Sequence, residues 1–239
     1  MGELVTRVPS RSRIFERLGI DFCCGGQRSL REACDEVGLD AGAVVRMLDA
    51  IVGEDRRADG VPFVDPAPLS LTDLADHIES THHLYLRDEL PRIQRLFTRA
   101  LNAHAIRHPW LQDASRVFEQ FTNELDSHIL KEEQILFPMI RAIDRATEPV
   151  QFHCGSLAAP IRVLESEHEN AGSALKTLRR LTGDFEPPVD ACTTVRALLD
   201  ALAELEADMH QHVHKENNVL FPRAIEREEK LRLGIASGN

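Results

Sequence analysis

The amino-acid sequence predicts an all-α protein, an antiparallel four-helix bundle preceded by a small helical N-terminal domain. From Leu69 onward, four long stretches carry apolar residues at helical spacing, and none alternates as a strand would. Prolines and glycines separate these stretches. The chain also repeats itself: "HILKEEQILFP" at His128 to Pro138 and "HVHKENNVLFP" at His212 to Pro222 are identical at six of eleven positions. Long helices joined by shorter loops pack as a bundle with antiparallel neighbours.

The N-terminal domain is expected over residues 1–58. Its helical patterns cover Arg11–Leu18, Ser29–Val37 and Ala41–Val52. The stretch "DGVPFVDPAP" that follows contains three prolines and a glycine, which prevent regular structure. Residues 59–69 are therefore predicted to be a linker, and residues 70–239 to form the bundle.

The first bundle helix begins at Ser70 or Thr72, either of which is an acceptable N-cap, and runs to about Ala103. The other three helices are expected at Ala114–Ile143, Leu157–Leu181 and Asp190–Glu228. "IESTH" in the first helix resembles "LESEH" in the third. Helices one and two thus resemble helices three and four, which implies a bundle with approximate internal twofold symmetry.

The composition indicates which partners are disfavoured and in which compartment the protein is expected. The 239 residues carry a formal net charge of -11, and no cluster of lysine and arginine stands out, so nucleic acid and anionic membranes are disfavoured. No apolar run is long enough to span a membrane, and the N-terminal sequence lacks the apolar stretch of a secretion signal. The protein is therefore expected in the cytoplasm, with its five cysteines as reduced thiols.

The two repeated motifs each place a histidine and a glutamate four residues apart on a helix. His128 with Glu132, and His212 with Glu216, can therefore each hold one ion from a single helix face. A lone pair of this kind is usually a solvated surface interaction. Here both copies run into an apolar "ILFP" or "VLFP", and burying an imidazole and a carboxylate without partners costs several kcal/mol. The repetition therefore predicts a bound metal.

Further residues extend this site. Glu124 and Asp208 lie one turn before the two histidines, where a carboxylate can orient a ligating imidazole. His168 is the obvious ligand of the third helix. In the first helix, the upstream apolar residues and the internal repeat favour His82, whereas the downstream apolar residues favour His83. The residues alone leave this choice open.

The number of donors indicates the metal. Four histidines and two glutamates are too many for one zinc ion, which takes about four ligands. Two carboxylates able to bridge, with nitrogen donors on either side, suit a pair of iron or manganese ions inside a helix bundle.

The chain resembles the RIC (repair of iron centres) family of di-iron proteins, of the YtfE and ScdA type. The residues that carry the resemblance are "DFCCGG" at Asp21–Gly26, "RDELP" at Arg87–Pro91, "ESEHENAG" at Glu165–Gly172, "EPPVDACTT" at Glu186–Thr194, and both His-x-x-x-Glu motifs. The resemblance implies an N-terminal domain of the ScdA type and a hemerythrin-like bundle. The metal ligands it implies are His83, His128, Glu132, His168, His212 and Glu216.

The resemblance also implies a cofactor and a function. The cofactor would be two non-haem iron ions, bridged by the carboxylates and by an oxo or hydroxo group when oxidised. The protein would repair iron-sulfur clusters damaged by nitrosative or oxidative stress, by donating iron to damaged or apo iron-sulfur proteins, and would be a monomer or a homodimer. Two alternatives remain: a nitric oxide or peroxide reductase at the same centre, or a hemerythrin-like sensor of dioxygen or nitric oxide.

The adjacent thiols of Cys23 and Cys24 form the second candidate site. Neighbouring Cα atoms are about 3.8 Å apart, below the usual disulfide range, so two free thiols are expected. A helix beginning near Ser29 would favour the thiolate form. Cys23 and Cys24 are therefore candidates for a redox or iron-transfer role, whereas Cys192, at the start of the fourth helix, is expected to be structural.

Overall fold

The computed structural model describes residues 1–50 and 69–234, and all regular structure within them is helical. The predicted linker, residues 59–69, lies outside the described residues except for Leu69, as does the end of the predicted helix Ala41–Val52. No helix among the described residues is long and apolar enough to cross a membrane. The all-α prediction is confirmed.

The chain divides into two compact units. The first comprises Met1–Ala75, Ile140–Ala158 and His210–Asn239, and the second comprises Asp76–Met139 and Ala159–Met209.

Short helices build the N-terminal part of the first unit. They are α1 (Gly2–Arg7), the 3₁₀ turn η1 (Pro9–Arg11), α2 (Ser12–Arg17), α3 (Leu30–Glu36) and α4 (Ala41–Ala50). Ser29 caps α3 in a capping box with Glu32, which satisfies two backbone N–H groups at the helix start. Phe15 and Phe22 stack in the buried core, with ring centroids 6.0 Å apart.

The first unit also contains all of α11 (Phe221–Arg232) and most of α5 (Leu71–Ile78) and α8 (Phe137–Arg145). Polar side chains fix the ends of these helices. Asp144 accepts the backbone N–H and the hydroxyl of Thr72 at 3.0 and 2.7 Å. Glu228 accepts the backbone N–H of Leu157 with both carboxylate oxygens at 3.2 Å.

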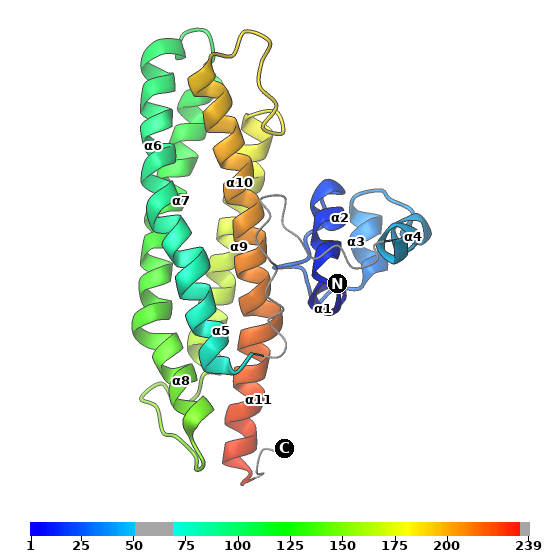
Figure 1. Ribbon diagram of the computed structural model, residues 1–239, viewed down its shortest axis with the longest axis vertical. Coiled ribbons are helices and arrows are strands. Elements are labelled where there is room, and N and C mark those ends of the chain that lie inside the picture. Colours follow the sequence, from blue (N-terminus) through cyan, green and yellow to red (C-terminus); the bar gives the residue numbers. More distant parts are fainter. Residues whose placement is uncertain (51–68, 235–239) are drawn as a thin grey trace. The chain divides into compact units, whose positions relative to one another are not determined.

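In the second unit, α6 (Leu84–His104), α7 (Trp110–Lys131), α9 (Ala158–Leu181) and most of α10 (Thr193–Lys215) run side by side as a four-helix bundle (Figure 1). Their packed faces are apolar, and Phe97 and Phe118 are fully buried with ring centroids 5.3 Å apart. The second predicted helix begins at Trp110, not at Ala114, directly after Pro109, whose fixed φ and missing N–H are compatible with a helix start. The fourth helical run ends at Arg232, beyond the predicted Glu228.

Three of the four predicted long helices are interrupted by a π-helical turn. These turns are η2 (Glu79–His83) between α5 and α6, η3 (Glu132–Leu136) between α7 and α8, and η4 (Glu216–Leu220) between α10 and α11. Single π turns inside α-helices are uncommon and occur frequently at functional sites. All three contain residues predicted to bind metal.

Candidate metal centre

Glu132, the first residue of η3, is surrounded by histidines in the second unit. Its Oε2 lies 3.3 Å from His83 Nε2, and its Oε1 lies 3.1 Å from His128 Nε2. His168 Nε2 lies 2.9 Å from His128 Nε2 and 3.9 Å from Glu132 Oε1. All four side chains are buried. A cation among them would bind nitrogen lone pairs and a carboxylate that otherwise crowd one another.

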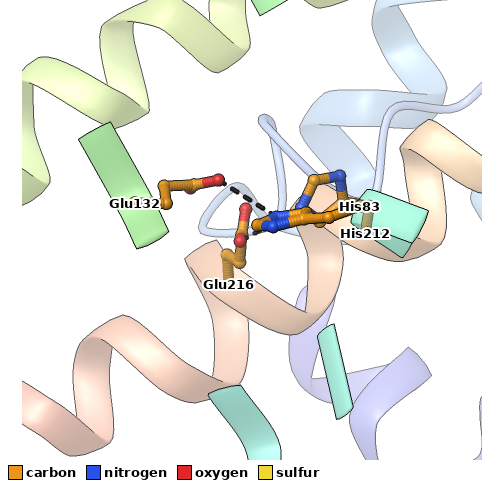
Figure 2. Close-up of side chains that lie close together, drawn as sticks. All are labelled: His83, Glu132, His212 and Glu216. Carbon is orange, nitrogen blue, oxygen red and sulfur yellow. Dashed lines mark hydrogen bonds and ion pairs between the residues drawn. The ribbon is translucent and has the colours of Figure 1, made fainter. Parts of the chain in front are cut away.

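The second His-x-x-x-Glu motif has the same local geometry. His212 Nε2 lies 3.1 Å from Glu216 Oε1, and both side chains are fully buried. Figure 2 shows His83 with Glu132 and His212 with Glu216, each pair joined by a dashed line. The i, i+4 spacing therefore places histidine and glutamate together in both copies, as the sequence predicts.

The described side chains include two groups of four that could each hold a metal ion. In each group, one ligand atom from every residue lies within 4.8 Å of the others. The groups are His83, Glu132, His212 and Glu216, and His128, Glu132, His168 and Glu216. They contain all six residues proposed as ligands, and both include Glu132 and Glu216. Nitrogen and carboxylate donors in this number fit a metal site.

A glutamate from another part of the chain orients each of two histidines. Glu133 Oε1 accepts from His83 Nδ1 at 2.9 Å, and Glu167 Oε2 accepts from His128 Nδ1 at 2.9 Å. Basic residues hold both glutamates in place, Arg87 at 2.6 Å from Glu133 and Lys131 beside Glu167. An ionised carboxylate can only accept, so each Nδ1 carries the hydrogen and Nε2 keeps its lone pair for a metal.

The same contacts keep these two carboxyls ionised. Burial raises the pKa of Glu133, but the hydrogen bonds from Arg87 and His83 outweigh burial and hold its pKa below the usual value. Burial also raises the pKa of Glu167. The hydrogen bonds from Lys131 and His128 lower it by more than burial raises it, so this pKa too lies below the usual value. Both side chains therefore accept hydrogen bonds as carboxylates at neutral pH.

The prediction that Glu124 and Asp208 would orient the two motif histidines is wrong in its details. Glu124 is exposed and accepts from Gln120 at 2.8 Å. Since His128 directs Nε2 towards Glu132, its Nδ1 meets Glu167 on α9 and not the preceding turn of its own helix. Asp208 lies 2.9 Å from Nδ1 of His82.

The two candidate histidines of the first helix are both buried. His83 belongs to a four-residue ligand group, whereas His82 belongs to neither group and directs Nδ1 to Asp208. The geometry therefore favours His83, the residue that the family resemblance indicates.

A pocket of about 610 Å³ opens beside this cluster in the second unit. Residues of α7 and α9 line it, and the lining includes His128, Lys131, Glu167 and His168. The pocket therefore borders the buried pair of His128 and His168. The sequence gives no signal for this pocket, because its walls come from helices distant along the chain.

Cys23 and Cys24 lie on a turn organised by Asp21 in the N-terminal part. Asp21 Oδ1 accepts the backbone N–H groups of Cys23, Cys24 and Gly25 at 3.1, 3.0 and 3.2 Å, and the Cys23 thiol donates to it at 3.3 Å. Neither cysteine forms a disulfide, as predicted; Cys23 is buried and Cys24 half-buried.

The expected stabilisation of a thiolate by the following helix is not seen at Cys23. Its hydrogen bond with Cys24, together with burial and the nearby charge of Asp21, raises the pKa of the Cys23 thiol well above its usual value. The helix α3 begins only at Leu30, too far along the chain to counter these effects. Cys192 has a partner that the sequence did not predict, since its Sγ lies 3.0 Å from His104 Nε2.

The helical bundle with paired histidine and glutamate ligands defines a hemerythrin-type metal-binding protein. The family model described as Hemerythrin HHE cation binding domain matches residues 74–224. A second model, ScdA_N, described as Domain of Unknown function (DUF542), matches residues 1–52.

Similar proteins cover nearly the whole chain. The "Iron-sulfur cluster repair protein YtfE" of Enterobacter sp. (strain 638) is 36% identical over 227 residues, covering 94% of this chain and 96% of the relative. The proteins of the same name from Cronobacter sakazakii and Citrobacter koseri are each 34% identical. Their alignments cover 96% and 94% of this chain, and 97% and 96% of the relatives. The chain belongs to the RIC family of YtfE-type iron-sulfur cluster repair proteins.

Proposed function

We propose that the protein holds two non-haem iron ions and repairs iron-sulfur clusters damaged by nitrosative or oxidative stress, by donating iron. The proposed ligands are His83, His128, Glu132, His168, His212 and Glu216. The observation that carries the proposal is that the two ligand groups share Glu132 and Glu216, which would bridge the ions.

The donor set suits iron. Each group offers two imidazole nitrogens and two carboxylates, and no thiolate. Such a set binds divalent iron or manganese, whereas a structural zinc site would be closed by about four ligands, often thiolates. Histidines whose Nδ1 is fixed by Glu133 and Glu167 are the tautomers that ligation through Nε2 requires.

The matched residues His82 and His83 test the ligand set. We expect H83Q to lower the iron content of the purified protein, because a ligand and its hydrogen bond to Glu133 are lost. H82Q serves as the control, because His82 directs its Nδ1 to Asp208 and belongs to neither ligand group. Elemental analysis of both variants reads out the difference. Iron loss from H82Q with full iron in H83Q would contradict the assignment.

Iron donation requires a site that can release iron. Divalent iron sits low in the affinity order of divalent metals, and a site without thiolates holds it less tightly than a thiolate cage would. Oxidation strengthens binding through the higher charge of the metal. Reduced protein should therefore lose iron to a chelator faster than oxidised protein, and equal rates would count against release controlled by redox state.

Cys23 and Cys24 are proposed to take part in delivery to the client, a damaged or apo iron-sulfur protein, in the cytoplasm. The half-buried Cys24 is accessible to a partner, whereas Cys23 is held beside Asp21. A double variant with C23S and C24S should keep its bundle iron but fail to reactivate a damaged cluster. Full repair activity in this variant would refute the role of the thiols.

Turnover of nitric oxide or peroxide at the same centre is the second candidate function. The pocket beside His128 and His168 favours it, because a small oxidant can reach the proposed ligands from there. Nitric oxide consumption should be measured beside anaerobic iron transfer to an apo iron-sulfur protein. Catalytic turnover without iron transfer would favour the reductase.

A further inference from the structure

A second cluster of metal-binding side chains lies in the N-terminal part of the chain. Asp21, Cys23 and Cys24 each offer one ligand atom, and these atoms lie within 4.8 Å of one another. Two sulfur donors and one oxygen make a set unlike that of the bundle, which has only nitrogen and oxygen donors.

The backbone around this cluster is tightly constrained. A Cβ atom on Gly25 would lie 2.9 Å from the carbonyl oxygen of Asp21, and one on Gly26 would lie 2.7 Å from that of Phe22. Asn218 donates to the carbonyl oxygen of Cys23 at 3.0 Å. The two glycines therefore allow a close turn that holds adjacent thiols next to one carboxylate. This arrangement is preorganised, which lowers the entropy cost of binding an ion.

We infer that Asp21, Cys23 and Cys24 form a separate binding site for one thiophilic divalent metal ion. The inference rests on the proposed function in one respect only, the identity of the natural ion. That ion would be the ferrous iron that the protein delivers to an iron-sulfur protein. Binding replaces the protons of both thiols with the metal, and these protons pass to solvent. One divalent ion on two thiolates and one carboxylate leaves a net charge of -1 and an open coordination position. An open position is what a transfer site needs, since an incoming ligand must bind before the ion leaves.

Asp21 has a simpler role that needs no metal, because its Oδ1 also caps the turn through three backbone N–H groups. The variant D21N separates the two roles. An asparagine oxygen still accepts the N–H groups, but the negative charge and the metal-binding carboxylate are lost. The turn should persist in D21N, and the metal affinity should fall.

Zinc is the probe, added to the iron-loaded full-length protein under reducing, anaerobic conditions. Equilibrium dialysis with elemental analysis should find one more zinc ion per chain in the wild type than in C23S or C24S. D21N should bind this zinc more than about 10-fold more weakly, since even the loss of a residue behind a ligand costs that much. Zinc should also slow the alkylation of Cys24 in the wild type, measured by peptide mass spectrometry, but not that of the exposed Cys154.

C192S is the matched control, because the thiol of Cys192 lies beside His104, outside the cluster. Its zinc binding should equal that of the wild type. Equal zinc binding by wild type and the double variant with C23S and C24S would overturn the inference, and so would equal binding by wild type and D21N. Bundle iron and cluster repair are measured in the same samples. Absence of this zinc site in wild-type protein that holds bundle iron and repairs clusters would overturn this inference alone, whereas a zinc site in wild-type protein that holds no bundle iron would overturn the proposed function alone.

Discussion

Replacing Glu167 by glutamine tests whether the carboxylates behind the histidines control iron affinity. Glu167 joins His128 Nδ1 at 2.9 Å to Lys131, and Glu133 joins His83 Nδ1 at 2.9 Å to Arg87. Glutamine keeps the shape and an acceptor oxygen but loses the charge, and charge-assisted hydrogen bonds are roughly twice as strong as neutral ones. Changes of this kind cost about 10- to 100-fold in metal affinity.

The structure places both variants near the lower end of that range. The Glu167 side chain is 29% exposed and that of Glu133 is 21% exposed, so solvent screens part of each interaction. We therefore expect E167Q and E133Q each to weaken ferrous iron binding about 10-fold, or about 1.4 kcal/mol. The two contacts share no residue and support histidines of different ligand groups, so in the double variant each of the two ions should bind about 10-fold more weakly.

Anaerobic competition with a chromophoric ferrous chelator measures this change. The control is E124Q, because Glu124 is the exposed residue that the sequence suggested for the same role, and its contact is with Gln120. E124Q should bind iron as the wild type does. If E124Q weakens binding as much as E167Q does, the assignment of Glu167 as the residue that orients His128 is refuted.

Three further predictions concern stability. F118A removes a fully buried ring from the bundle core and should lower the free energy of unfolding by about 3 to 5 kcal/mol in urea titrations; a loss below 1 kcal/mol would contradict the packing. R179M leaves the buried carboxylate of Glu206 without its guanidinium partner and should cost about 2 to 3 kcal/mol, partly recovered in the double variant with E206Q. S29A removes the cap of α3 at a cost of about 1 kcal/mol, seen as faster amide exchange in that helix. The hydrogen bond with Ser29 lowers the pKa of Glu32 in the folded protein. The stabilisation from this pair is therefore present above the unfolded-state pKa of Glu32 and is lost as the pH falls through its folded-state pKa. The stabilities of S29A and the wild type should therefore converge in acid.

Residues that act within one helix could be predicted from the sequence. His128 with Glu132, and His212 with Glu216, meet because an i, i+4 spacing fixes their relative position whatever the rest of the fold does. The capping box at Ser29 is local in the same way. The helices themselves follow from the spacing of apolar residues, which burial requires.

Contacts between helices could not be predicted in this way. Glu167 is 39 residues from His128, and Glu133 is 50 residues from His83. Which glutamate meets which imidazole depends on the rotation and axial shift of the packed helices. The pattern of one helix face contains neither quantity, so the prediction of Glu124, the acid one turn before His128 on the same helix, is wrong.

The π turns explain why the apolar pattern alone could not choose between His82 and His83. Upstream of the two histidines, the buried residues Leu74 and Ile78 lie four residues apart. In an unbroken α-helix the same spacing places His82 on this buried face. Burial downstream follows Leu86, Leu90 and Ile93, and the alternation of four- and three-residue steps leads back to His83. The turn η2 lies between the two stretches, and an i→i+5 turn accommodates one extra residue without breaking the helix. Both histidines are therefore buried, one in each phase.

The repeated motif has the same property. In each copy the π turn begins at the glutamate, and the next α-helix begins at Phe137 or Phe221, followed by proline. Proline has no N–H to donate to the preceding turn, so Pro138 and Pro222 are compatible with a change of hydrogen-bond pattern there. The helix α9, which provides only His168 to the ligand groups, has no π turn within its described length. The π turns therefore occur in the three long helices that carry a proposed ligand within the turn itself, and in the two repeated motifs the "LFP" at the end of the turn is its sequence signal.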